Sequence, residues 1–253
     1  MDILGKTVSE KTAAEINRLI EHIQHKVDFV PLPLDNPFGW GQADWYTSPN
    51  WTVRIVTELP QAYFEANLLH ELYHLCQVAE GFPLTSTKDQ PDISIPQQKL
   101  IDRAGGALTS VILDLDVCDR IVLFGLDSDY FFDDRYKKAM ETSFSFDSNL
   151  RDTKISLTVH LAGIILQNST WQSNFVLNHC LAQNKLLAQR AKNLAKTLKR
   201  IDHSTPEGCL KCLVAGYDYL DIWDWQNIDY QGLQFTSSEQ ANTFLLSSHP
   251  DSE

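Results

Sequence analysis

The chain has 253 residues, of which 43% are apolar and 10% aromatic, and its formal net charge is −12. This length suffices for one large domain or two small ones, and the apolar share excludes a disordered chain. The negative charge argues against a nucleic-acid-binding face, which would be basic, and against binding to an anionic membrane surface. We therefore expect a globular protein that binds neither nucleic acid nor membrane.

The amino-terminal residues lack the apolar core of a signal peptide, and no segment reaches the roughly 18 consecutive apolar residues of a membrane span. The five cysteines are Cys76, Cys118, Cys180, Cys209 and Cys212. Three of them fall in helical apolar stripes, where a cysteine packs as a small buried side chain. Together these features predict a protein of the reducing cytoplasm.

The first predicted element is a helix over Ser9–Val27, because apolar residues recur there at helical spacing. Ser9 or Thr7 is its expected cap. His22 and His25 lie on the more polar side of this helix, and we interpret them as solvated side chains rather than metal ligands.

A loop and then a strand are predicted next. Phe29–Asn50 is rich in proline, glycine and aromatic residues, which favours a loop. Trp51–Thr57 has the alternating, β-branched pattern of a strand. The expected fold class is therefore α+β, mainly α-helical, with a small sheet that carries this strand.

The next segment contains the pattern H-E-x-x-H as His70, Glu71 and His74. A helix is predicted from Pro60 to Glu80, because no glycine or proline interrupts that range and Gly81 follows it. Residues four apart lie on one side of a helix, so the two imidazoles can bind one Zn²⁺. Glu71 lies beside them, where it can take a proton from an attacking water.

Two other interpretations of this pattern compete with a zinc site. The side chains could decorate a solvated helix face, but the apolar residues of this helix gather on the side opposite the histidines, which suits a metal helix supported from behind. A di-iron bundle would need E-x-x-H on two helices, and Glu71-x-x-His74 is the only such pair in the chain. A zinc site is the favoured prediction.

A catalytic zinc needs a third protein ligand and an open position. The following predicted helix, Gln97–Phe124, offers Asp102, Asp114, Asp116 and Asp119. Asp102 and Asp114 have small neighbours that leave room for a metal, whereas Asp119 falls in the apolar stripe and is expected to be a buried hydrogen-bonding residue. Two glycines within this helix could admit another backbone or break the helix in two.

The rest of the chain reads as mostly helical. Helices are predicted over residues 133–142, Ile155–Gln167, Trp171–Arg200 and Pro206–Tyr219, and the tail after Phe235 is expected to fray. The second half of the long helix carries a run of cations, namely Lys185, Arg190, Lys192, Lys196, Lys199 and Arg200.

Cys209 and Cys212 form a C-x-x-C pair within the last of these helices. A structural zinc site would need a second ligand pair, and the chain has no other C-x-x-C. We interpret the two cysteines as ordinary helix residues.

Two motifs between His70 and Asp127 resemble those of a known protein family. His70-Glu71-Leu72-Tyr73-His74 with Ala79-Glu80-Gly81-Phe82-Pro83, and the looser Asp114-x-x-Val117-x-x-Arg120-Ile121-x-x-x-Gly125-Leu126-Asp127, are similar to motifs of bacterial zincin-like metallopeptidases of the gluzincin type. These are distantly similar to the gluzincin domains of phage-repressor-cleaving and radiation-response regulators. The resemblance covers about residues 51–130.

The resemblance implies that Asp114 is the third ligand, with Asp102 in reserve. Gluzincins use glutamate there, so the shorter aspartate would require the helix to come closer. The implied division is a zincin-like domain over residues 1–147 and a helical region over residues 148–253, for which we name no counterpart.

The expected function is a cytoplasmic zinc metallopeptidase, a hydrolase whose extended substrate lies along Trp51–Thr57. That the substrate is a regulatory protein rests on the resemblance alone. One rival is a non-catalytic zinc-bound binding or regulatory module that uses the C-terminal helices. Another is a zinc hydrolase acting on a non-peptide amide. The chain has no phosphate-binding glycine-rich loop, Gly-x-Ser-x-Gly elbow or credible cysteine nucleophile, and its oligomeric state is not predicted.

Overall fold

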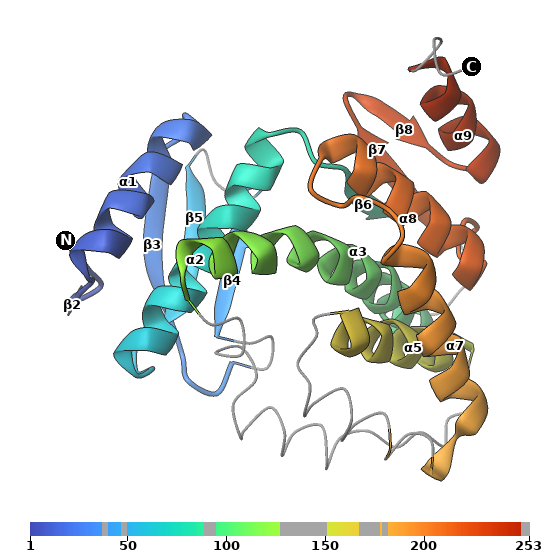
Figure 1. Ribbon diagram of the computed structural model, residues 1–253, viewed down its shortest axis with the longest axis horizontal. Helices are drawn as coiled ribbons and strands as arrows, with labels where there is room; N and C mark the ends of the chain where they lie inside the picture. Colours follow the sequence, from blue (N-terminus) through green and yellow to red (C-terminus); the bar gives the residue numbers. More distant parts are fainter. Residues whose placement is uncertain are drawn as a thin grey trace. The chain divides into compact units, whose positions relative to one another are not determined.

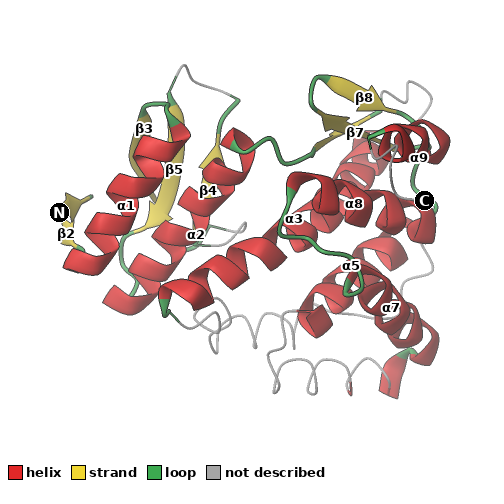
Figure 2. Cartoon of the chain, turned by 45° about the horizontal axis from the view of Figure 1, so that its top comes forward, coloured by secondary structure: helices red, strands yellow, loops and turns green. Residues whose placement is uncertain are grey.

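The computed structural model describes residues 1–36, 40–46, 50–88, 95–126, 151–166, 178 and 182–248, with side chains omitted for residues 95–104 and 151–153. Over these ranges the protein is α+β and mainly helical, as predicted (Figure 2). No helix in the described ranges combines the length and apolar composition that a membrane span needs.

The chain forms two compact units. The first contains Met1–Glu80 and the end of a long helix from Val117 onward, and the second contains Gly81–Asp116 and the described residues from 151 onward. The predicted domain limit at residue 147 lies outside the described residues and stays a prediction.

A three-stranded sheet forms one side of the first unit. Its strands are β3 (Val27–Leu32), β4 (Gly41–Asp44) and β5 (Trp51–Val56), in the order β3-β5-β4. The central β5 is parallel to β3 and antiparallel to β4, so both of its edges are hydrogen-bonded. The prediction of β5 is confirmed, but the loop predicted over Phe29–Asn50 is wrong in part. Strand β3 was not predicted because it contains Pro31. An edge strand such as β3 tolerates a proline, which has no N–H group to donate.

Two helices, α1 (Glu10–Ile23) and α2 (Gln61–Ala79), lie side by side over this sheet (Figure 1). They confirm the two predicted helices. Ser9 caps α1 as expected, since its hydroxyl accepts a hydrogen bond from the Thr12 amide. A short hairpin of β1 (Asp2–Ile3) and β2 (Lys6–Thr7) precedes them. The core that they share includes Ile16, Leu19, Ile23, Val53, Ile55, Phe64, Leu68, Leu69, Leu72 and Leu75.

Hydrogen bonds that are buried or partly buried hold α2 against α1. The Glu65 carboxylate accepts from the Ser9 amide at 2.9 Å, from the Ser9 hydroxyl at 2.8 Å and from the Thr12 hydroxyl at 2.5 Å. Further along α2, the Tyr73 hydroxyl donates to Glu15 at 2.8 Å. Because these bonds lie at both ends of the contact, they limit rotation of α2 about its own axis.

The long helix α3 (Ile95–Phe124) is unbroken and confirms the helix predicted there. Its last turns belong to the first unit, where Val117 and Ile121 are buried in the core. Arg120 binds both carboxylate oxygens of Glu80, at 3.0 and 2.6 Å. Such a two-point contact fixes the relative geometry of the end of α3 and the end of α2.

The second unit is mostly helical and also contains a small antiparallel sheet. Its further helices are α5 (Arg151–Leu166), α7 (Lys185–Leu198), α8 (Pro206–Leu220) and α9 (Ser238–Ser247), and its strands, in sheet order, are β6 (Leu84–Thr87), β7 (Gln226–Tyr230) and β8 (Leu233–Phe235). Helices α5 and α7 lie side by side, with α8 beside α7 (Figure 1). Buried residues of α3, α5, α7 and α8 form a core around Leu108, Ile112, Val159, Leu194, Leu213 and Tyr217. A second cluster between α5 and α7 includes Leu157, Leu161, Leu187 and Ala191.

Two predictions for this unit are wrong. The basic helix does not run unbroken from Trp171, because Asn184 has non-helical dihedral angles and its side chain caps α7 at the Leu187 amide. The tail after Phe235 does not fray, because it forms α9, and the Phe244 ring packs on Tyr230 and Phe235. The helix predicted over residues 133–142 lies outside the described residues.

Gly105 and Gly106 neither break α3 nor admit another backbone. Instead, the Gln226 side chain of β7 lies against Gly105, so closely that a Cβ atom at that position would overlap it. Gly106 is exposed and has open space around it. Only the first of the two glycines is therefore needed for packing.

Candidate metal centre

His70 and His74 lie one turn apart on α2 with their rings edge to face. The two Nε2 atoms are 3.0 Å apart and the ring centroids 4.6 Å apart. At that separation two nitrogen lone pairs repel each other unless a proton or a cation lies between them. The pair is therefore suited to share a proton or to bind one positive ion.

Asp114 of α3, the residue that the resemblance implies as third ligand, lies close to the two histidines. One carboxylate oxygen and the two histidine nitrogens all lie within 4.8 Å of one another. Asp114 precedes Val117 by three residues and Ile121 by seven. It therefore lies on the same side of α3 as these two residues, which are buried in the core. The Arg120–Glu80 contact lies six residues beyond Asp114 on one helix and six beyond His74 on the other, and it steadies both.

The other acidic candidates differ from this one. Asp102 lies twelve residues earlier in α3, or roughly 18 Å along the helix axis, so a single site beside the histidines can include only one of the two. Asp119, expected to be buried, is exposed, whereas Asp116 is buried. The prediction for Asp119 is wrong because the buried stripe of α3 follows Val117 and Ile121 and leaves Asp119 on the outer side.

Glu71 is buried, with 8% of its surface exposed, and is not one of the three clustered residues. Its neighbour is Gly41, the first residue of β4. A Cβ atom at that position would lie 2.5 Å from Glu71 Oε1 and 2.7 Å from its Cγ. The absence of a side chain at residue 41 therefore leaves the space that the Glu71 carboxylate occupies.

Gln77 is a further residue of the site that sequence reasoning missed. It is 1% exposed, and its Oε1 lies 3.0 Å from His74 Nδ1. Residues 70, 74 and 77 share one side of the helix, so helical spacing from the histidines could have pointed to it. Gly41 had no comparable signal, because it is distant in sequence and comes close only through the sheet.

The chemistry of these residues fits zinc. Two imidazole nitrogens and one carboxylate oxygen match the three protein ligands of a catalytic zinc site, which leaves one position open. Ligands bonded at about 2.0–2.1 Å in a tetrahedron are roughly 3.3 Å apart, close to the 3.0 Å between the two Nε2 atoms. Mg²⁺ and Ca²⁺ prefer sites made only of oxygen atoms.

The cluster does not include His22, His25, Cys76, Cys209 or Cys212. His22 Nε2 lies 3.1 Å from Glu80 Oε1, and His25 stacks on Trp51. Burial raises the pKa of the Cys76 thiol to about 12. Cys209 and Cys212 are buried in α8, and burial likewise raises the pKa of each thiol. Buried thiols of this kind are poor nucleophiles, so the interpretation of the C-x-x-C pair as packing residues is consistent with the structure.

Comparisons with known protein families, with curated proteins and with solved structures find no match. The resemblance to zincin-like metallopeptidases therefore stays a prediction, and the case for a function is made from the site itself.

Proposed function

We propose that this protein is a zinc-dependent metallopeptidase acting in the cytoplasm. The observation that carries the proposal is the cluster of His70, His74 and Asp114 within 4.8 Å, with the buried Glu71 next to the first histidine in the chain. Two imidazoles, a carboxylate and a separate glutamate are the groups that metal-assisted amide hydrolysis requires.

In this mechanism each residue has one task. His70, His74 and Asp114 would hold the ion, and the ion would supply a Lewis acid and lower the pKa of water toward about 7. Glu71 accepts a proton from the attacking water and later donates it to the leaving nitrogen. Gly41 leaves space for the Glu71 carboxylate, which a side chain at residue 41 would displace.

The expected position of the substrate needs correction. A peptide cannot add to β5 (Trp51–Val56), because both edges of that strand are already paired. Among the described strands β4 (Gly41–Asp44) forms an edge of the sheet, and its first residue lies against Glu71. We propose that an extended peptide pairs with β4, where main-chain hydrogen bonds would place it next to the general base. A regulatory protein is the proposed substrate.

The test of the proposed function is a search for new protein termini in cells that express the wild type or Glu71→Gln. A peptidase produces termini in the wild-type cells that are missing from the variant cells, because glutamine cannot accept the proton. Identical sets of termini would contradict the peptidase proposal, and only the proposed zinc site would remain.

Substitution of Gly41 by alanine tests the contact with Glu71. We expect hydrolysis to fall by roughly 10²-fold, since a misplacement of about 1 Å can cost that much. The free energy of unfolding should fall by no more than about 1–3 kcal/mol, because the Glu71 side chain can move aside. Gly106→Ala is the matched control, because that exposed position has nothing within 4 Å. Equal activity of both variants would show that residue 41 does not position the base.

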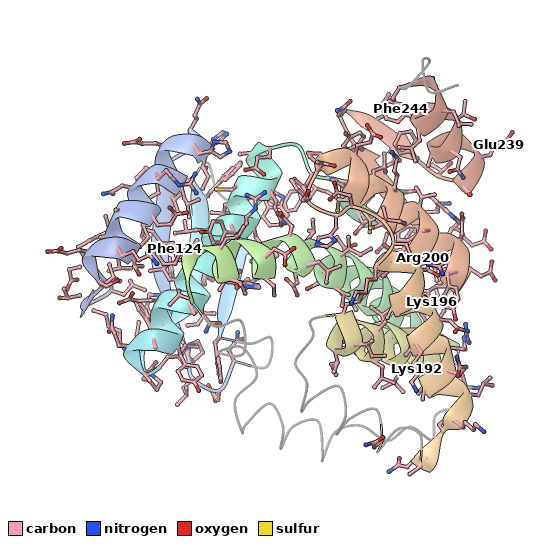
Figure 3. All side chains as sticks on the ribbon, in the orientation of Figure 1. Phe124, Lys192, Lys196, Arg200, Glu239 and Phe244 are labelled. Atoms are coloured by element: carbon pink, nitrogen blue, oxygen red, sulfur yellow. The ribbon has the colours of Figure 1, made fainter. Side chains whose placement is uncertain are left out.

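A second candidate function is a non-catalytic binding module, and one observation favours it. The described part of the chain from 182 to 201 carries six cations and no acidic residue, and none of the six forms an ion pair with a described carboxylate. Lys192 and Lys196 lie on α7, and Arg200 follows the end of that helix (Figure 3). An acidic protein surface would suit this row. The same search for termini separates the two candidates, because a binding module produces no new termini.

A further inference from the structure

The ring of His74 makes polar contacts through both of its nitrogens. Nδ1 lies 3.0 Å from Gln77 Oε1, and Nε2 lies 3.0 Å from His70 Nε2. Gln77 is 1% exposed, so water does not compete for its amide oxygen. Both partners come from α2 itself, which makes the geometry a property of one helix.

A neutral imidazole carries one proton, and its partner decides which nitrogen holds it. An amide oxygen accepts hydrogen bonds and cannot donate, so Gln77 Oε1 requires the His74 proton to be on Nδ1. Nε2 of His74 then presents a lone pair toward His70 and Asp114. The opposite orientation of the amide would place an NH₂ group at Nδ1, move the proton to Nε2 and abolish metal binding by that atom.

We infer that Gln77 is a positioning residue for the metal site, one that holds His74 in the tautomer able to bind a cation through Nε2. This inference rests on the proposed zinc site. It also assigns the His70 tautomer. With the His74 Nε2 atom accepting, the 3.0 Å contact requires His70 to donate from its own Nε2 in the metal-free protein. A cation would replace that proton, and His70 would then carry its proton on Nδ1.

The inference predicts unequal behaviour of two neighbouring histidines. In ¹⁵N NMR spectra of the metal-free protein at pH 8, His74 should be protonated on Nδ1 and His70 on Nε2. Addition of Zn²⁺ should leave the His74 tautomer unchanged and move the His70 proton to Nδ1. A His74 that carries its proton on Nε2 in the metal-free wild type would overturn the inference.

Variants of Gln77 test the same point through affinity. Gln77→Met keeps the length of the side chain but removes the acceptor, and Zn²⁺ affinity measured by competition with a chelator should fall roughly 10–100-fold. Gln77→Glu keeps an acceptor at Nδ1 and should bind Zn²⁺ at least as tightly as the wild type. Gln61→Met is the control in the same helix, because that amide donates to Glu65 and not to a histidine.

The outcomes separate this inference from the function on which it rests. If the wild type binds no Zn²⁺, the proposed function fails, while the tautomers of the metal-free protein still decide the role of Gln77. If Gln77→Met binds Zn²⁺ as tightly as the wild type does, Gln77 has no positioning role, whatever the fate of the peptidase. Should Gln77→Met fail to fold, Gln77→Glu and the wild-type spectra remain decisive.

Discussion

Replacement of Glu71 by glutamine is expected to slow peptide hydrolysis by roughly 10²–10⁴-fold while zinc content and melting temperature stay at the wild-type values. Glutamine has nearly the same shape, so it fits beside Gly41 without a new overlap. It cannot take a proton, so only the transfer step is lost. Stability should not suffer, because a neutral amide at this buried position replaces a charge that burial disfavours.

The kcat is measured for a peptide that spans one of the cleavage sites identified by the new termini. Metal analysis and a thermal melt are done on the wild type and on Glu71→Gln. Glu58→Gln serves as the control, since Glu58 is exposed just before α2 and bonds only to the neighbouring Thr57 hydroxyl among the contacts of described residues. A Glu71→Gln protein that has lost its zinc would identify Glu71 as a ligand and contradict the assignment of a general base.

Local patterns predicted the helices that carry the site. The uninterrupted run before Gly81 predicted α2, and a stripe of apolar residues predicted α3, since both signals depend only on residues a few positions apart. Six apolar residues were assigned to the back of α2, namely Leu68, Leu69, Leu72, Leu75, Cys76 and Ala79. The first five are buried, and only Ala79 at the helix end is exposed. The order of strand, metal helix and second helix was predictable for the same reason.

Features that depend on distant contacts were not predictable in this way. Strands β3 and β4 contain proline or glycine and are stabilised by pairing with β5, which no local pattern reports. Spacing alone left Asp102 and Asp114 as alternatives, because both have small neighbours. In the structure Asp114 lies close to the histidines, on the side of α3 from which Val117 and Ile121 pack into the core.

Several polar residues near the histidines of α2 are buried. Asn67 and Gln77 on the histidine side are 4% and 1% exposed, and Glu71 beside it is 8% exposed. Burial strengthens the contact between Gln77 Oε1 and His74 Nδ1, and this limits the orientation of the His74 ring. The site is therefore held by its own helix as well as by α3.

Loss of the histidines should have the largest effect on the metal. A protein with both His70→Ala and His74→Ala is expected to bind no stoichiometric zinc, because two of the three proposed ligands are gone. Metal analysis after dialysis against a weak chelator measures this, with the wild type at one zinc per chain. His22→Ala with His25→Ala is the matched control, since those imidazoles contact Glu80 and Trp51 instead.

The third ligand is tested by a pair of variants that differ only in position on α3. Asp114→Asn should weaken Zn²⁺ binding by roughly 10²–10³-fold, since a structural zinc site with four protein ligands binds with about 10–16 kcal/mol, or roughly 2.5–4 kcal/mol per ligand. Asp102→Asn should bind as the wild type does, because a residue roughly 18 Å further along the helix cannot reach the same ion. The reverse result, with Asp102→Asn weakened and Asp114→Asn unchanged, would mean that α3 presents a different turn to the histidines in solution. Unchanged affinity in both variants would mean that the site is completed by a residue outside α3.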